Sequence, residues 1–267
     1  MIETLNRAFM YGESVFTTLR VVDGLMHNFD HHFERLRKGV EFVYGPFTEG
    51  EDWTALFRNR LETRCALETG DKILRITVYQ EQARGLSRNG ILSIADLRIN
   101  FQSSPLDLQH LSTQRTLRLR TCPVVSRPLW WPGFLKSGDY LGSILAQKVY
   151  LKPEDDDLLF VSRDDTVLES SVANIFFVRH NKLYTAPTGP NVLEGVMRRK
   201  VIEVACEYFD EFHEVETTLE QAFKADAVFG SNSIRGLFLI SHVDDTEFVF
   251  SREFLLKFDV LSKQVLK

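Results

Sequence analysis

The chain has 267 residues, 44% of them hydrophobic, and 32 lysines and arginines against 37 aspartates and glutamates give it a formal net charge of −5. This composition is typical of one or two folded domains and excludes a disordered or fibrous chain. The basic residues are scattered among acidic ones, which argues against a nucleic-acid-binding surface.

Neither a membrane segment nor a disulfide framework is expected. No apolar run approaches the roughly 18 residues that cross a bilayer, and the first residues lack the basic and apolar parts of a leader, so we expect a cytoplasmic protein without membrane association. The three cysteines, Cys65, Cys122 and Cys206, lie far apart without C-x-x-C spacing. This spacing predicts free thiols.

The N-terminal part predicts mixed α and β structure. Its elements are a strand at 14–24, a helix at 29–43 opened by Asp30, a helix at 53–67, and strands at 72–79 and 92–101. In the first helix an apolar face recurs at helical spacing, through Phe29, Phe33, Leu36, Val40 and Val43. Residues 102–114 are polar, contain a proline and lack periodicity, which is typical of an interdomain linker.

The C-terminal part continues the same mixture. Its elements are a strand at 116–125, a loop rich in proline and tryptophan at 126–135, a helix at 139–152, strands at 157–163 and 171–179 flanking a turn at 164–165, a loop at 185–195, a helix at 196–209, strands near 226–230 and 236–243, and a helix from Ser251. Because strands and helices do not alternate strictly, a doubly wound parallel sheet is disfavoured. We expect an α+β protein of two α/β domains, 1–107 and 108–267, with mixed, largely antiparallel sheets.

Two residues could carry covalent or ring-binding chemistry. Lys136 follows a constrained Pro/Gly loop and precedes an amphipathic helix, where a rigidly held, desolvated amine suits Schiff-base chemistry. Glu169 begins an apolar strand and is followed by Ser170, Ser171 and Asn174, so its carboxylate could hold a protonated ring nitrogen. The alternatives are a solvated surface lysine and a turn glutamate.

Three further features could bind an anion. Gly195 directly precedes a helix, so the amides of Val196 and Met197 point outward at the positive end of the helix dipole. The segment F-G-S-N-S-I-R-G at 229–236, with Asn232 and Ser233, could complete the same cradle, although alone it is typical of a turn. Arg35 precedes the apolar Leu36 and could reach inward, or could be solvated.

Metal and hydrolase chemistry have little support. His31 and His32 lack a third ligand at metal spacing, and no G-x-S-x-G motif is present. We therefore expect no metal.

The order of these motifs resembles a known family. H-x-x-R-L, a loop lysine, E-S-S-x-x-N-I-F, L-x-G-V-x-R and S-N-S-x-x-G follow one another as in the fold-type IV pyridoxal-phosphate enzymes, the class IV aminotransferase family, from about Arg7 to Val243. The resemblance implies a fold like that of D-amino-acid aminotransferases, the cofactor pyridoxal 5'-phosphate, a small-molecule substrate, and a homodimer.

The resemblance also implies roles for individual residues. Lys136 would form the Schiff base and shuttle the proton, and Glu169, with Asn174 beside it, would pair with the pyridine nitrogen. The remaining cofactor-binding residues would hold the phosphate; they are Arg35, Val196, Met197, Asn232 and Ser233.

Within the family, some motifs look more like those of aminodeoxychorismate lyases. These motifs are F-T-T at 16–18, S-N-S-x-R-G at 231–236 and A-R-G at 83–85. At the position of F-T-T, branched-chain aminotransferases have F-E-G and D-amino-acid aminotransferases have Y-E. A lyase would convert 4-amino-4-deoxychorismate to 4-aminobenzoate and pyruvate, a step of folate precursor synthesis. Its substrate-binding residues would be Tyr11, Thr18, Arg20 and Arg84, the arginines receiving a carboxylate bidentately.

Two alternatives stay open. One is an aminotransferase acting on branched-chain or D-amino acids with a 2-keto acid acceptor. The other is a noncatalytic small-molecule binding protein on the same scaffold, which the presence of Lys136, Glu169 and the phosphate residues disfavours.

Overall fold

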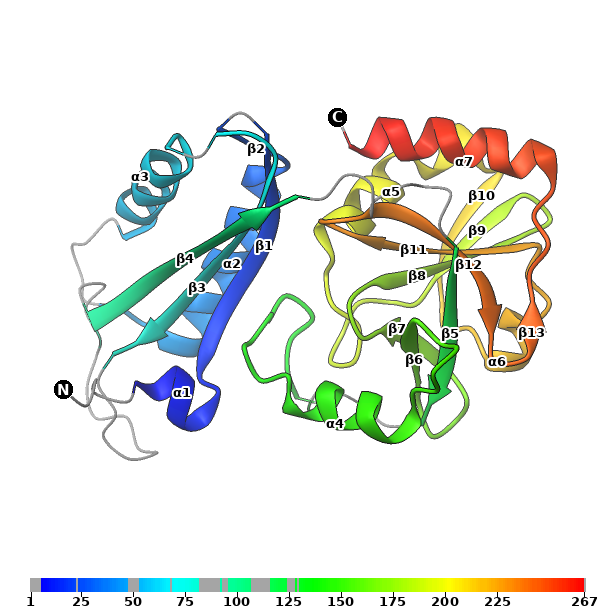
Figure 1. Cartoon of the computed structure of the whole chain (residues 1–267), viewed down its shortest axis with the longest axis horizontal. Helices are drawn as coiled ribbons and strands as arrows, with labels where there is room; N and C mark the ends of the chain where they lie inside the picture. The colour runs from blue at the N-terminus through cyan, green and yellow to red at the C-terminus, as the bar shows by residue number, and fades with distance from the viewer. Residues whose placement is uncertain are drawn as a thin grey trace. The chain divides into compact units, whose positions relative to one another are not determined.

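The chain divides into two units (Figure 1). The computed structural model describes residues 6–22, 24–47, 53–67, 69–81, 92, 96–106, 116–123, 128 and 130–266. Unit 1 comprises Met1–Leu106 and Phe134–Asp139, and unit 2 comprises Asp107–Gly133 and Tyr140–Lys267. The segment with Lys136 thus lies in unit 1, whereas the sequence places it in the C-terminal domain.

Unit 1 is built on a four-stranded antiparallel sheet in the order β2-β1-β3-β4. Its elements are α1 (Arg7–Tyr11), β1 (Ser14–Val22), β2 (Leu25–Met26), α2 (Phe29–Tyr44), α3 (Trp53–Cys65), β3 (Lys72–Gln80) and β4 (Leu97–Pro105). The helix that was predicted to be opened by Asp30 begins at Phe29, with Asp30 in its first turn.

One face of this sheet is buried against α2. Side chains alternate between the two faces of a strand, and Val15, Thr17, Leu19 and Val21 of β1 are buried on the same face. The apolar face predicted for α2 is buried at Phe33, Leu36 and Val40, while Phe29 and Val43 are half-buried. In Figure 1 α2 lies behind β1 and β3. The opposite face of the sheet, with Phe16, Thr18 and Arg20, is therefore the face turned away from α2.

Strand β4 differs from the prediction at both ends. It begins at Leu97 rather than at residue 92, and it runs to Pro105, into the segment predicted as a linker. Proline has no N–H to donate to a neighbouring strand. It is tolerated there because β4 lies at the end of the strand order, so no hydrogen bond between strands is lost. Residues 107–115 lie outside the described part of the chain.

Unit 2 is built on a mixed nine-stranded sheet. Its elements are β5 (Leu117–Cys122), α4 (Leu141–Tyr150), β6 (Asp157–Val161), β7 (Val167–Ser170), β8 (Asn174–Arg179), β9 (Lys182–Thr185), α5 (Val196–Tyr208), β10 (Glu211–Glu214), α6 (Leu219–Ala222), β11 (Ala227–Asn232), β12 (Gly236–Val243), β13 (Thr246–Glu247) and α7 (Arg252–Val265). The strand order is β10-β9-β8-β11-β12-β5-β6-β7; the ninth strand, β13, pairs with β12 beside this order, and β7 also pairs with β8. The strands from β8 round to β7 therefore form a closed barrel.

Two apolar clusters explain the position of the helices of unit 2. The barrel interior is filled by side chains such as Leu119, Ile175 and Ile240. On the outer face Phe176 and Phe229 stack at 5.0 Å and pack with residues of α5 and α7, which lie along one side of the barrel in Figure 1. The barrel has no open sheet edge among its six strands, which protects these strands from pairing with another chain.

The short elements of unit 2 were not all predicted. Glu169 lies in β7, a strand of its own, and not at the start of a single strand covering 171–179. The four-residue elements β9, β10 and α6 were missed because they are too short to show a periodic pattern.

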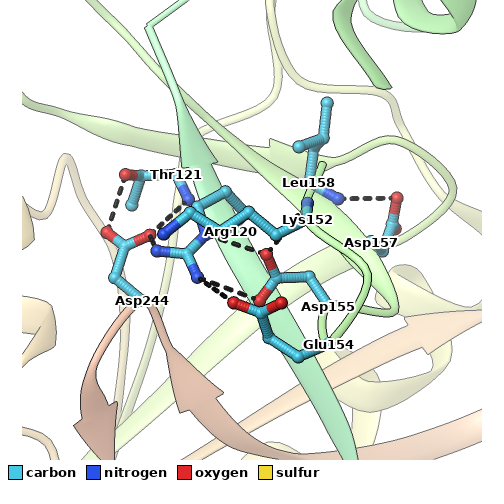
Figure 2. A network of polar contacts seen from close by, with 8 residues as sticks. All are labelled: Arg120, Thr121, Lys152, Glu154, Asp155, Asp157, Leu158 and Asp244. Carbon is cyan, nitrogen blue, oxygen red and sulfur yellow. Dashed lines mark hydrogen bonds and ion pairs between the residues drawn. The ribbon is translucent and has the colours of Figure 1, made fainter. Parts of the chain in front are cut away.

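A buried ion pair fastens β5 to two loops of unit 2 (Figure 2). Arg120 donates from Nε to Asp155 Oδ2 at 2.8 Å and from Nη2 to Oδ1 at 3.3 Å, and its Nη1 lies 3.2 Å from Asp244 Oδ1. Asp244 also accepts the backbone N–H and the hydroxyl of Thr121. The hydrogen bond to Asp155 is the main cause that raises the pKa of Arg120. This network ties the turn after β12 and the loop before β6 to the same strand.

Candidate functional site

The backbone around Lys136 extends the sheet of unit 1. Phe16 donates its N–H to Lys136 O, and Gly138 donates to Ser14 O, both at 2.9 Å, on either side of a bridge between Val15 and Ser137. A side chain at position 138 would overlap Ser14 Oγ, so glycine permits this close pairing. The pairing with β1 is the physical reason that Lys136 belongs to unit 1.

Lys136 lies on the sheet face that is turned away from α2. Its Nζ is 4.9 Å from the centroid of the Phe16 ring, a cation–π distance. Phe16 and Lys136 are neighbours across the strand pair, so both side chains stand on the same face. The lysine is half-buried there.

Two arginines share this face. Arg75 of β3 pairs with Thr18 of β1, and its guanidinium carbon lies 3.5 Å from the centroid of the Phe16 ring. Arg20 is two residues further along β1 than Thr18, and burial lowers the pKa of its guanidinium while Asp71 opposes this shift. Strands β1, β3 and β4 contain no aspartate or glutamate. The result is a cationic face around Lys136, which we call the Lys136 face.

Arg75 was missed by sequence reasoning. Its strand was predicted, but the face on which it stands follows only from the register between β1 and β3. Of the other predicted substrate residues, Tyr11 is in α1 with the Arg7 guanidinium carbon 5.1 Å from its ring centroid. Arg84 lies outside the described residues.

Arg35 is held on the other face, between α2 and β1. It is buried, and its Nη2 donates to Thr17 Oγ1 at 3.1 Å. Thr17 Oγ1 also makes a 2.7 Å hydrogen bond with His32 Nδ1. Of the two alternatives that the sequence left open for Arg35, the side chain therefore reaches inward.

In unit 2 three polar side chains form a row across neighbouring strands. Glu169 of β7 pairs with Asn174 of β8, which pairs with Ser231 of β11. Asn174 Nδ2 donates to Glu169 Oε2 at 3.1 Å and to Leu193 O at 2.9 Å, and the Leu193 N–H donates to Glu169 Oε2 at 2.9 Å. All three side chains of the row are buried.

Helix α5 begins beside this row. Its N-cap, Gly195, provides no side-chain cap, and the first helical residues Val196 and Met197 are buried. Any side chain at 195 would overlap Asn174 Oδ1, so the start of the helix approaches the row closely. The uncapped amides of a helix start are donors for an anion.

Ser231 supplies a second donor that the sequence did not single out. It is 2% exposed, and its hydroxyl has no hydrogen-bond partner in the described structure. A buried hydroxyl without a partner is costly unless a ligand satisfies it. The alternation along β11 places Ser231, rather than Asn232, on the α5 side with Phe229.

Asn232 is the last residue of β11, and Ser233 lies in the turn that follows it. Asn232 Oδ1 accepts the N–H groups of Ile234 at 3.0 Å and Arg235 at 2.7 Å. This carbonyl therefore closes the turn, and the side-chain amide is the group left to act as a donor.

Among the described residues no cluster of His, Cys, Asp or Glu could hold a metal ion, and no helix is long and apolar enough to cross a membrane.

Comparisons with known proteins give matches over most of the chain. The family model for class IV aminotransferases matches residues 14–243. Aminodeoxychorismate lyase of Bacillus subtilis (strain 168) is 22% identical over 255 residues, which cover 93% of this chain and 83% of that protein. D-alanine aminotransferase of Staphylococcus epidermidis is 22% identical over 242 residues, which cover 90% of this chain and 82% of that protein.

A solved structure shows the same fold. The 4-amino-4-deoxychorismate lyase from Pseudomonas aeruginosa aligns with a TM-score of 0.83 at 23% identity, covering 98% of this chain and 94% of that one. The predicted α+β fold with mixed sheets is thereby confirmed.

Proposed function

The chain belongs to the class IV aminotransferase family, whose enzymes depend on pyridoxal phosphate, and from this we propose that it is a lyase that converts 4-amino-4-deoxychorismate to 4-aminobenzoate and pyruvate. Its relatives include both lyases and aminotransferases. The choice between them therefore depends on the substrate that this chain's own residues suit.

The charge of the Lys136 face carries the proposal. Arg20 and Arg75 stand on this face with Lys136, and no acidic side chain occurs in β1, β3 or β4. 4-Amino-4-deoxychorismate carries two carboxylates, whereas an apolar amino acid carries one. Two guanidinium groups can each receive a carboxylate bidentately, so the face suits the dianion better.

The residues of unit 2 fit the cofactor. The buried hydroxyl of Ser231 and the uncapped start of α5 suit its phosphate, and the fixed Glu169 carboxylate suits its ring nitrogen. In unit 1, Arg35 is proposed to add charge-assisted hydrogen bonds to the phosphate. When bound, pyridoxal phosphate supplies an electron sink for the carbon next to the reacting amine.

The chain's own groups then have separate tasks. Lys136 Nζ takes the proton from the amine-bearing ring carbon of the substrate, because a half-buried amine on a fixed backbone can be placed at that carbon. Arg20 and Arg75 hold the carboxylates and so orient the ring. Cleavage of the ring C–O bond then releases the enolpyruvyl group, which gains the proton that Lys136 took and becomes pyruvate, while the ring becomes the aromatic ring of 4-aminobenzoate.

The decisive experiment is incubation of the loaded enzyme with 4-amino-4-deoxychorismate and no keto acid. We expect equal amounts of 4-aminobenzoate, measured by fluorescence, and pyruvate, measured with lactate dehydrogenase. Absence of both products from a protein that shows the visible absorbance of bound cofactor would refute the lyase function.

The second candidate is an aminotransferase, favoured by the similarity to D-alanine aminotransferase. It would need a 2-keto acid acceptor and would produce no 4-aminobenzoate. Assays with D-alanine or branched-chain amino acids and 2-oxoglutarate test it directly.

We also propose a homodimer, supported by an apolar face on α4. Leu141, Ile144, Leu145 and Val149 are 62%, 58%, 50% and 71% exposed in the single chain, and positions 141, 145 and 149 recur at the four-residue spacing of one helix face. Exposed apolar faces of this kind mark protein interfaces. Sedimentation analysis of an Ile144→Glu variant tests this, and we expect it to shift towards monomer.

A further inference from the structure

A buried chain of three polar side chains connects β1 with α2 in unit 1. Thr17 Oγ1 lies between His32 Nδ1 at 2.7 Å and Arg35 Nη2 at 3.1 Å. Their exposed fractions are 1% for Thr17, 1% for His32 and 8% for Arg35. At this burial each hydrogen bond is shielded from water, so the three groups constrain one another.

The direction of the Arg35–Thr17 hydrogen bond follows from the chemistry of the two groups. Arg35 can only donate, so Thr17 Oγ1 is the acceptor of that bond. The single hydroxyl proton of Thr17 is then available for His32 Nδ1. Burial, followed by the charges of Arg35, His31 and Lys136, lowers the pKa of His32 well below its usual value, so the ring is neutral and Nδ1 can accept.

This arrangement orients the guanidinium before any ligand arrives. An arginine side chain has many rotamers, and fixing one of them in advance removes an entropic cost from binding. Thr17 follows Phe16, whose N–H is bonded to Lys136 O. Consecutive residues of β1 therefore hold Arg35 on one face of the sheet and the backbone of Lys136 at its edge.

We propose that Thr17 and His32 are positioning residues: His32 orients the Thr17 hydroxyl, and Thr17 fixes the Arg35 guanidinium for binding the cofactor phosphate. The inference rests on the proposed function, because it needs Arg35 to bind that phosphate. A purely structural role of the same hydrogen bonds would stabilise unit 1 without distinguishing a phosphorylated ligand from its unphosphorylated analogue.

The test compares matched variants with two ligands. Thr17→Val removes the hydroxyl at nearly constant volume, and Thr17→Ser keeps it. His32→Leu removes the acceptor, and His32→Asn keeps an acceptor close to the position of Nδ1. For each variant the dissociation constants of pyridoxal phosphate and of pyridoxal are measured by absorbance, together with the melting temperature.

Thr17→Val and His32→Leu are expected to weaken pyridoxal phosphate binding by about three- to tenfold, the effect of one hydrogen bond, and to leave pyridoxal binding unchanged. Thr17→Ser and His32→Asn are expected to restore the affinity to within about twofold. Thr121→Val, which removes a hydroxyl bonded to Asp244 at 2.7 Å in unit 2, controls for loss of stability alone and should change neither constant.

An equal loss for both ligands in Thr17→Val or His32→Leu would overturn the positioning role. Arg35→Ala separates this failure from failure of the proposed phosphate contact. If Arg35→Ala weakens pyridoxal phosphate selectively and Thr17→Val does not, only the positioning role is wrong. If Arg35→Ala weakens both ligands equally, the phosphate contact itself is wrong. Should Thr17→Val fail to fold, the two His32 variants make the same comparison.

Discussion

Asn174 and Glu169 are joined twice, because their backbones form the pair through which β7 meets β8 and Asn174 Nδ2 donates to Glu169 Oε2 at 3.1 Å. The same oxygen accepts the Leu193 N–H. The orientation of this carboxylate therefore depends on closure of the barrel and on the loop that precedes α5.

Glu169→Gln should retain the cofactor and lose turnover. Glutamine can still accept the N–H groups of Leu193 and Asn174, but it brings no negative charge to the ring nitrogen. A hydrogen bond to a charged group is worth roughly 1.5–3 kcal/mol, so we expect kcat to fall by about 10- to 150-fold at saturating cofactor. Glu203→Gln, on the exposed side of α5, is the control. Unchanged turnover of Glu169→Gln would contradict the role.

Lys136→Ala should lose turnover by roughly three or more orders of magnitude, because both the covalent link and the proton acceptor are removed. Reduction of the wild-type holoenzyme with borohydride, followed by peptide mapping, should place the pyridoxyl group on Lys136. An adduct on another lysine would overturn the assignment.

Arg75→Met should impair substrate binding without affecting the cofactor. Losing one charge-assisted carboxylate contact is expected to raise KM for 4-amino-4-deoxychorismate by about 10- to 100-fold. Lys72→Met is the matched control, since Lys72 lies on the same strand but pairs with Val21, on the face turned towards α2. Equal effects of the two variants would show that general charge, and not Arg75, governs binding.

Arg120→Met should strongly destabilise unit 2. The Asp155 side chain is 0% exposed, so loss of Arg120 leaves a buried carboxylate without its cation. Breaking one side of such a pair costs about 3–5 kcal/mol. Arg199→Met breaks an exposed pair with Glu203 on α5 and should cost less than about 1 kcal/mol. Urea unfolding compares the two, and similar losses would show that the Arg120 network contributes little.

The free energy of unfolding of unit 1 should decrease as the pH falls below about 6.5, which is the pKa of histidine in an unfolded chain. The pKa of His32 is lowered in the folded state, chiefly by burial, so below this pH the unfolded chain binds a proton that the folded chain does not. The free energy of unfolding then decreases by about 1.4 kcal/mol per pH unit until the folded pKa is reached. His32→Asn should lack this part of the slope. An identical slope in wild type and variant, between pH 7.5 and 5.5, would contradict it.

The sequence predicts best the elements whose apolar pattern repeats several times along the chain. The apolar face of α2 repeats over several turns, so its buried side could be assigned before the structure was known. The motifs likewise identified Lys136 and Glu169 as candidates. Neither pattern contains information about which strands become neighbours.

Register accounts for most of what was missed. Arg75 reaches the Lys136 face only because Thr18 pairs with it, and Ser231 joins the row of Glu169 only because Asn174 pairs with it. The place of Lys136 in unit 1 depends on a pairing with Phe16 across a long stretch of chain. Such contacts are fixed by tertiary packing, which local propensity does not encode.

The insertion of Phe134–Asp139 into unit 1 means that neither unit is a continuous piece of chain. A fragment ending at Leu106 would contain β1 without the lysine strand that completes its edge, and a fragment starting at Asp107 would contain the lysine without its backbone partner, Phe16. Gene fusions or split reporters that cut the chain between the two units would thus yield halves that regain the lysine geometry only on reassociation. Domain exchange between relatives has to transfer 134–139 together with residues 1–106.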